Sequence, residues 1–71
     1  MLNSVLLKSQ IVLHNRKLSD IADKLNISKS ALYRKLNGKT EFTRYEIEIL
    51  IKYLGLSVEI AMEIFFNEKV S

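Results

Sequence analysis

The basic side chains of this chain are concentrated in its middle, where they could bind a polyanion. Eight of the eleven lysine and arginine residues lie between residues 16 and 44, against three carboxylates, so this segment carries a net charge of +5. Residues 45–71 instead carry a net charge of −3. The separation predicts that an anionic partner meets the middle of the chain. The eight basic residues are Arg16, Lys17, Lys24, Lys29, Arg34, Lys35, Lys39 and Arg44.

The other polar residues do not assemble a catalytic or metal-binding set. His14 is the only histidine and the chain has no cysteine, so neither a zinc site nor a histidine-based catalytic pair is supported. Glu59 and Glu63 share a helix face at a spacing of four residues, but no Glu-x-x-His pattern supplies further ligands. We therefore expect a protein that is not an enzyme and that uses no metal or cofactor.

Length and hydropathy predict one small domain spanning residues 1–71. Hydrophobic residues make up 48% of the chain, which is enough for a single core. No apolar run exceeds three residues, so we expect neither a membrane span nor a secretory signal. The absence of cysteine suits a reducing compartment, and we expect a soluble cytoplasmic protein without a membrane partner.

Apolar residues recur at helical spacing and never sustain the alternation of a strand, which predicts an all-α fold with five helices. The helices are expected over about 2–13, 19–25, 29–36, 44–54 and 57–66. In the first helix the expected inward stripe is Leu2, Leu6, Ser9 and Leu13, flanked by Val5 and Val12. In the second and fourth helices the residues expected to pack inward are Ile21, Ala22, Leu25, Ile47, Leu50, Ile51 and Leu54.

Capping residues mark the helix starts. Ser28 is a good N-cap for the third helix, and Thr43 with Glu46 makes a full capping box for the fourth. The start of the second helix has two alternatives, a cap at Ser19 or a beginning one turn earlier at Asn15. The expected hydrophobic staples are Ile27 with Leu32 and Phe42 with Ile47.

The turn between the second and third helices is short and has a distinctive composition. Leu25-Asn26-Ile27-Ser28 provides the three- to four-residue connection that is typical of a helix-turn-helix. Ala22 is small where the two helices would cross, and Asn26 tolerates the positive φ that the turn often needs. Gly38 can end the third helix in the left-handed conformation. Residues from about 18 to 38 are therefore predicted to form a helix-turn-helix.

These residues resemble a known family. The stretches Ile21-Ala22-Asp23-Lys24-Leu25-Asn26-Ile27-Ser28 and Leu32-Tyr33-Arg34-Lys35-Leu36-Asn37-Gly38-Lys39 are similar to the lambda-repressor-like, Cro/repressor (Xre) helix-turn-helix family. The closing stretch from Phe42-Thr43 through Leu54-Gly55-Leu56-Ser57 to Ile64-Phe65-Phe66 resembles small phage-encoded members. Three positions depart from the pattern. Asn26 replaces a common glycine, and Leu18 replaces a polar residue that touches the DNA backbone. Lys35 replaces an apolar residue, and we expect it to face outward.

The resemblance implies a five-helix, lambda-repressor-like domain in which the helix that starts near Lys29 enters the major groove of double-stranded DNA. The residues implied to contact bases are Lys29, Ser30, Tyr33 and Arg34, whose two cations can donate to guanine O6 and N7. The residues implied to contact the DNA backbone are Arg16, Lys17, Asn37, Lys39, Thr40 and Arg44.

The function implied is a sequence-specific transcriptional regulator of the bacterial cytoplasm or nucleoid. It would be a phage-type repressor or Cro-like protein, binding a pseudo-palindromic site as a homodimer. The alternative is a protein-interaction module, such as an anti-repressor, that uses the acidic C-terminal helices. Phe65 and Phe66 could form a dimer patch or pack in the core, and Tyr33 could be a half-buried packing residue. The alternative for Lys29, Arg34 and Lys35 is a solvated helix face.

Overall fold

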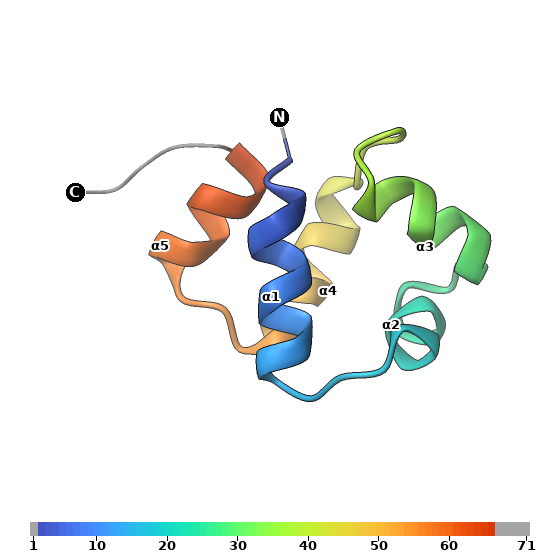
Figure 1. Cartoon of the computed structure of the whole chain (residues 1–71), viewed down its shortest axis with the longest axis horizontal. Helices are drawn as coiled ribbons and strands as arrows, with labels where there is room; N and C mark the ends of the chain where they lie inside the picture. Colours follow the sequence, from blue (N-terminus) through green and yellow to red (C-terminus); the bar gives the residue numbers. More distant parts are fainter. Residues whose placement is uncertain (1, 67–71) are drawn as a thin grey trace.

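Residues 2–66, the part of the chain that the computed structural model describes, form five α-helices joined by short turns (Figure 1). They are α1 (Ser4–Leu13), α2 (Leu18–Leu25), α3 (Lys29–Leu36), α4 (Arg44–Leu54) and α5 (Val58–Ala61), which continues into the π-helical turn η1 (Met62–Phe66). This part contains no strand, so the all-α prediction is confirmed. Met1 and residues 67–71, including Glu68 and Lys69 of the acidic segment, lie outside it. Among the described helices, none has the length and apolar character needed to cross a bilayer.

The core lies where α1 crosses the middle of the molecule, with α5 on one side of it and α2 and α3 on the other (Figure 1). The backbone N–H of Asn3 donates to the carbonyl of Ile64 at 2.7 Å, which ties the start of α1 to η1. Every segment from α1 to η1 except α5 contributes a large side chain that is almost wholly buried. These side chains are Leu7, Ile21, Leu32, Leu50, Leu54 and Ile64.

The predicted helix-turn-helix is present. Ala22 and Leu25 of α2 are buried, and so are Leu32 and Leu36 of α3, so the two short helices pack through apolar faces. Asn26 in the turn has a φ of 57°, as its tolerance for the left-handed region predicted. The backbone N–H of Ile27 then donates to the carbonyl of Ala22 at 3.0 Å, which ends α2 and turns the chain toward α3.

Four of the helices end in the same way. After α1, α2, α3 and α4 the chain passes through a residue with positive φ, and the next N–H bonds a carbonyl five residues back, as in a Schellman motif. The residues with positive φ are Asn15, Asn26, Gly38 and Gly55. Both alternatives for the start of α2 are therefore wrong. Asn15 ends α1, and α2 begins at Leu18 with Lys17 at the N-cap and no side-chain capping bond.

The predicted N-caps of α3 and α4 are confirmed. Ser28 Oγ accepts from the N–H of Ala31 at 3.1 Å. At α4, Thr43 N–H donates to Glu46 Oε1 at 2.8 Å and Glu46 N–H donates to Thr43 Oγ1 at 3.1 Å, which completes the capping box. The first residue of α3 is thus held in place by local bonds, which sets where its exposed face begins.

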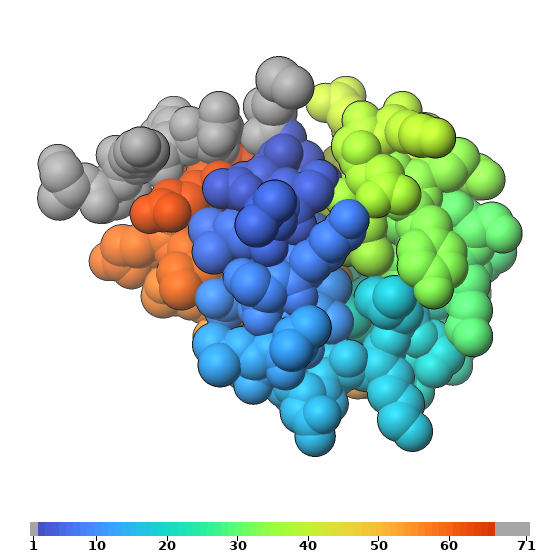
Figure 2. Space-filling view, in the orientation of Figure 1, coloured from blue at the N-terminus to red at the C-terminus, as the bar shows by residue number. Residues whose placement is uncertain are grey.

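The predicted inward face of α1 is correct for Leu2 and Leu6, which are partly buried against the core, but wrong for Ser9 and Leu13, which are exposed. The helix buries Leu7, Gln10 and Ile11, whereas Val5 and Val12 are 80% and 77% exposed. Apolar residues occur on every side of this helix, so their spacing does not select a face. The packing of the neighbouring helices makes the selection, and one side of α1 stays uncovered (Figure 2).

Candidate nucleic-acid interface

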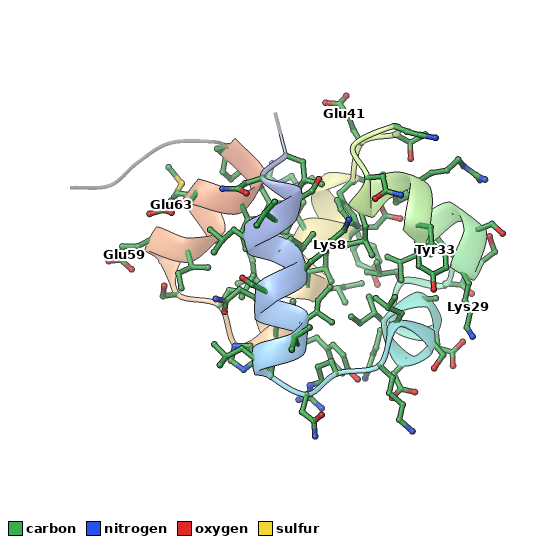
Figure 3. All side chains as sticks on the ribbon, in the orientation of Figure 1. Lys8, Lys29, Tyr33, Glu41, Glu59 and Glu63 are labelled. Atoms are coloured by element: carbon green, nitrogen blue, oxygen red, sulfur yellow. The ribbon has the colours of Figure 1, made fainter. Side chains whose placement is uncertain are left out.

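The exposed face of α3 gathers the four side chains that were predicted to contact bases. Leu32 and Leu36 point into the core, and the opposite side of the helix carries exposed Lys29, Ser30, Tyr33 and Arg34. Lys29 and Tyr33 project from α3 into solvent in Figure 3. Tyr33 is 50% exposed, so its ring is accessible rather than packed in the interior. Guanidinium, ammonium and hydroxyl groups on one helix face are the donors that suit the edges of bases in a major groove.

The loop after α3 and the first residue of α4 add donors beyond the end of this face. Lys39 and Thr40 are exposed in the loop, and the Arg44 side chain is 94% exposed at the start of α4. Its Nε lies 4.0 Å from Glu48 Oε1, a long contact on the helix surface. Exposed pairs of this kind contribute little, so Arg44 remains able to bind an anion.

Lys8 is a basic residue of this surface that the sequence analysis did not single out. Its Nζ donates to Asn37 Oδ1 at 3.0 Å, which brings α1 against the C-terminal end of α3. Figure 3 shows Lys8 reaching from α1 toward α3. Lys8 is the sole charged residue of positions 1–13, so the sequence predicts that its side chain is exposed. The sequence does not predict which residue lies next to it.

The two basic residues before α2 differ in their surroundings. Lys17 is exposed at the N-cap of α2. The Arg16 guanidinium lies 4.5 Å from the centre of the Tyr53 ring, and its NH2 group is 3.5 Å from the Tyr53 carbonyl oxygen. Arg16 is therefore engaged with the C-terminal end of α4. Leu18, the first residue of α2, is half-buried against the core.

The expectation that Lys35 faces outward is wrong. Its side chain is only 14% exposed, and Nζ donates to Glu46 Oε1 at 3.0 Å and to the Glu41 carbonyl at 3.0 Å. Burial of the Glu46 carboxyl raises its pKa, but hydrogen bonds from Thr43 and the bond and charge of Lys35 outweigh that effect. The pKa of Glu46 is therefore lowered, which favours its ionised carboxylate near neutral pH.

The acidic side chains of residues 2–66 are placed unevenly around α3: Asp20 and Asp23 are exposed on the neighbouring α2, and the others lie in the loop after α3, on α4 and on the C-terminal segment. The α3 helix itself contains none. Glu41 projects from the following loop, and Glu59 and Glu63 lie at the opposite side of the molecule from Lys29 and Tyr33 (Figure 3). Glu59 and Glu63 of the acidic C-terminal segment thus lie far from Lys29 and Tyr33, which favours the approach of a polyanion from the α3 side.

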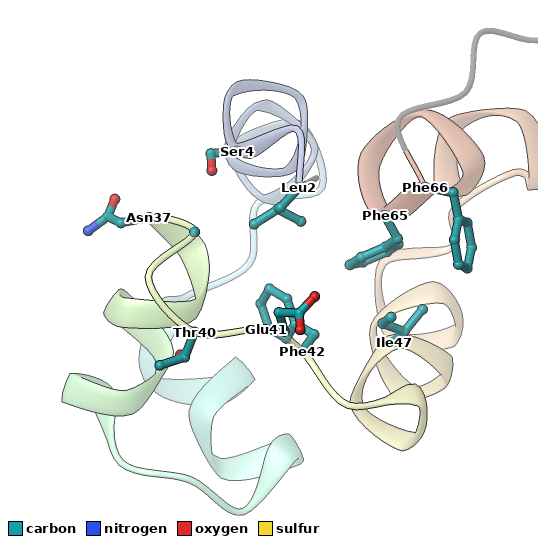
Figure 4. A pocket seen from close by; sticks show the side chains of 10 residues that line it. Leu2, Ser4, Asn37, Thr40, Glu41, Phe42, Ile47, Phe65 and Phe66 are labelled. Atoms are coloured by element: carbon teal, nitrogen blue, oxygen red, sulfur yellow. The ribbon is translucent and has the colours of Figure 1, made fainter.

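An open groove of about 620 Å³ runs between the α3–α4 loop, the start of α1 and η1 (Figure 4). Phe42 and Phe65 meet there edge to face, with ring centres 6.0 Å apart. Phe65 is half-buried against the core, whereas Phe66 is 55% exposed. Residues 2–66 contain no group of three or more His, Cys, Asp or Glu side chains that could hold a metal ion. The groove is lined by apolar side chains such as Phe42, Ile47 and Phe65 and by polar ones such as Asn37, Thr40 and Glu41.

Comparison with known proteins agrees with this geometry. The helix-turn-helix family profile matches residues 7–60, which runs from α1 into α5 and includes the whole of α2 and α3. No curated protein and no solved structure gives a significant match. Because the profile covers more than half of the 71 residues, the chain belongs to the lambda-repressor-like (Xre) helix-turn-helix family, a DNA-binding regulator fold.

Proposed function

We propose that this protein is a sequence-specific transcriptional regulator of the phage repressor or Cro type, which reads double-stranded DNA with α3. The observation that carries the proposal is the shared exposed face of α3, where Lys29, Ser30, Tyr33 and Arg34 project together from a helix without acidic residues. Arg34 and Lys29 would donate to guanine O6 and N7, and Ser30 and Tyr33 to neighbouring base edges.

Backbone contacts would frame this helix from both ends. Lys17 lies before α2, while Asn37, Lys39, Thr40 and Arg44 follow α3. Phosphate contacts fix register and orientation but do not read sequence, so these residues would hold α3 in the groove. Arg16 would contribute less than the others because its guanidinium is engaged with Tyr53.

Two copies would bind one operator. The described part of the chain measures 35 × 24 × 20 Å and offers one recognition helix. A single helix reads a short half-site, so a two-fold homodimer on a pseudo-palindrome, with half-sites about 34–36 Å apart, would supply the specificity. Inserting about 5 base pairs between the half-sites would rotate them to opposite faces of the duplex and should abolish cooperative binding.

The test begins with selection of a binding site from random duplex DNA, followed by fluorescence anisotropy across salt concentrations. The proposal expects log K to fall linearly with log[salt], by about 0.9 for each phosphate contact. Lys29→Ala with Arg34→Ala should remove base preference, and Arg34→Ala by itself should weaken operator binding by about 1–3 kcal/mol. The control for Arg34→Ala is Lys52→Ala, which removes one positive charge from an exposed position on α4 outside the basic segment. Binding that is insensitive to salt and to the paired Lys29→Ala and Arg34→Ala changes would refute the proposal.

One observation favours a second candidate, a protein-interaction module. Val5, Val12 and Leu13 leave an apolar side of α1 in solvent, at 71–80% exposure. Large exposed apolar patches mark sites of protein association. This candidate predicts that the wild-type chain selects no duplex sequence and binds DNA only weakly, so the same selection experiment separates the two.

A further inference from the structure

Lys35 connects three parts of the molecule from a nearly buried position. Its Nζ donates both to the carbonyl of Glu41, in the α3–α4 loop, and to Glu46 Oε1, in the first turn of α4. The same oxygen of Glu46 accepts the N–H of Thr43. One ammonium group on α3 is therefore bonded to the loop and, through Glu46, to the capping box of α4.

The loop is also held by its aromatic residue. Lys35 Nζ lies 5.8 Å from the centre of the Phe42 ring, and Phe42 packs edge to face on Phe65. The segment between α3 and α4 is thus anchored at the Glu41 carbonyl, the Phe42 ring and the Thr43 N–H. Lys39 and Thr40 lie between these anchors and α3, and Arg44 follows directly after them.

We propose that Lys35 is a positioning residue for DNA binding, which sets the place of Lys39, Thr40 and Arg44 relative to the base-reading face of α3. This inference rests on the proposed function. With 14% of its side chain exposed and its ammonium engaged by two oxygens, Lys35 does not itself reach DNA. It acts by holding the backbone-contacting loop at the right distance from Lys29 and Arg34.

Stability by itself does not account for a charged pair at this position. Replacing a buried ion pair by apolar residues of similar volume is often neutral or stabilising, so such pairs are weak evidence for a role in stability. An apolar side chain at position 35 would fill the space, but it could not bond the Glu41 carbonyl and so would not fix the direction of the loop.

The test compares Lys35→Met with Lys52→Met, which removes the same charge from an exposed position on α4. Fluorescence anisotropy measures binding of the selected operator, its single-base variants and unrelated DNA across salt concentrations.

For Lys35→Met we expect the slope of log K against log[salt] to be smaller in magnitude by about 1–2. One or two phosphate contacts would be lost, and each contributes roughly 0.9 to this slope. The ratio of operator to unrelated affinity should change by less than about twofold, because base contacts are kept. Lys52→Met should keep the wild-type slope.

Amide hydrogen exchange of the full chain separates a local effect on the loop from a loss of global stability, while the salt dependence of binding is the readout that a purely structural role would not change. In Lys35→Met the loop amides of residues 39–43 should exchange faster while those of α1 stay protected. A folded Lys35→Met protein with the wild-type slope and loop protection overturns the inference. If Lys35→Met fails to fold, Glu46→Gln keeps the capping acceptor, weakens the ion pair and is judged by the same two measurements. If the wild-type chain itself lacks salt-dependent operator binding, the proposed function fails instead.

Discussion

Lys8 on α1 donates a hydrogen bond of 3.0 Å from Nζ to Oδ1 of Asn37, the residue that caps the C-terminal end of α3. An ammonium group can only donate, so the amide oxygen of Asn37 faces Lys8 and its NH2 group is directed elsewhere. The NH2 group of Asn37 is therefore left as a hydrogen-bond donor at the C-terminal end of α3, and the positive charge of Lys8 lies beside it.

Loss of Lys8 should weaken DNA binding without changing sequence preference. We expect Lys8→Met to reduce affinity about equally for operator and unrelated DNA and to lower the salt slope by about 1. Anisotropy titrations of Lys8→Met, Asn37→Ala and the double variant measure this. If Lys8 acts through Asn37, the two effects will be less than additive. Fully additive effects would mean that the two side chains act independently.

Arg44 and Arg16 should differ in their contribution to DNA binding, although both lie in the basic segment. Arg44 is 94% exposed at its side chain, whereas the Arg16 guanidinium stacks 4.5 Å from the centre of the Tyr53 ring. Arg44→Ala should lower the salt slope by about 0.9, the value for one phosphate contact. Arg16→Ala should change the slope less and instead reduce the free energy of unfolding by about 0.5–1 kcal/mol, as loss of an exposed cation–π contact does. Equal slopes for the two variants would contradict this assignment.

The inward face of α1 can be tested by stability alone. Leu7 is fully buried, so Leu7→Ala should reduce the free energy of unfolding by about 2–5 kcal/mol. Val5 is 80% exposed, and Val5→Ala should change the free energy of unfolding by no more than about 0.5 kcal/mol. Urea unfolding followed by circular dichroism gives both values. A large loss of stability from Val5→Ala with a small one from Leu7→Ala would show that α1 buries the face expected from the sequence instead.

The pH dependence of stability should reflect the ion pair of Lys35 and Glu46. Because the pKa of Glu46 is lower in the folded state, its ionised carboxylate stabilises the fold at neutral pH. This contribution is present above the pKa of the unfolded chain and is lost as the pH falls through the lowered pKa of the folded state. We expect the free energy of unfolding to fall more steeply on acidification in the wild type than in Glu46→Gln.

The measurement is urea unfolding at a series of pH values from about 7 to 3, the range over which carboxylates titrate. The other carboxylates are the same in both proteins, so the difference between the two curves isolates Glu46. Parallel curves would show that Glu46 has the same pKa in the folded and unfolded chains. At neutral pH the Glu46→Gln protein should be the less stable of the two.

Features that depend on a few neighbouring residues could be predicted from the sequence. The caps at Ser28 and Thr43, the left-handed residues Asn26 and Gly38, and the short turn between α2 and α3 all follow from local backbone chemistry. The start of α2 is the local exception. Two residues there competed as helix starts, but Asn15 was needed to end α1. The exposed face of α3 was also predictable, because Leu32 and Leu36 occur at helical spacing in a helix that is otherwise mostly polar.

The sequence by itself thus determined the helices, the helix-turn-helix and the separation of basic from acidic segments, because each is written in residues close together in the chain. Only the tertiary structure decided which side of α1 is buried, that Lys35 turns inward to Glu46, that Lys8 reaches Asn37 and that Arg16 stacks on Tyr53. In each case the partner lies on another element. Long charged side chains, and helices with apolar residues on every side, take the direction that their neighbours in space allow, and spacing along the chain does not record those neighbours.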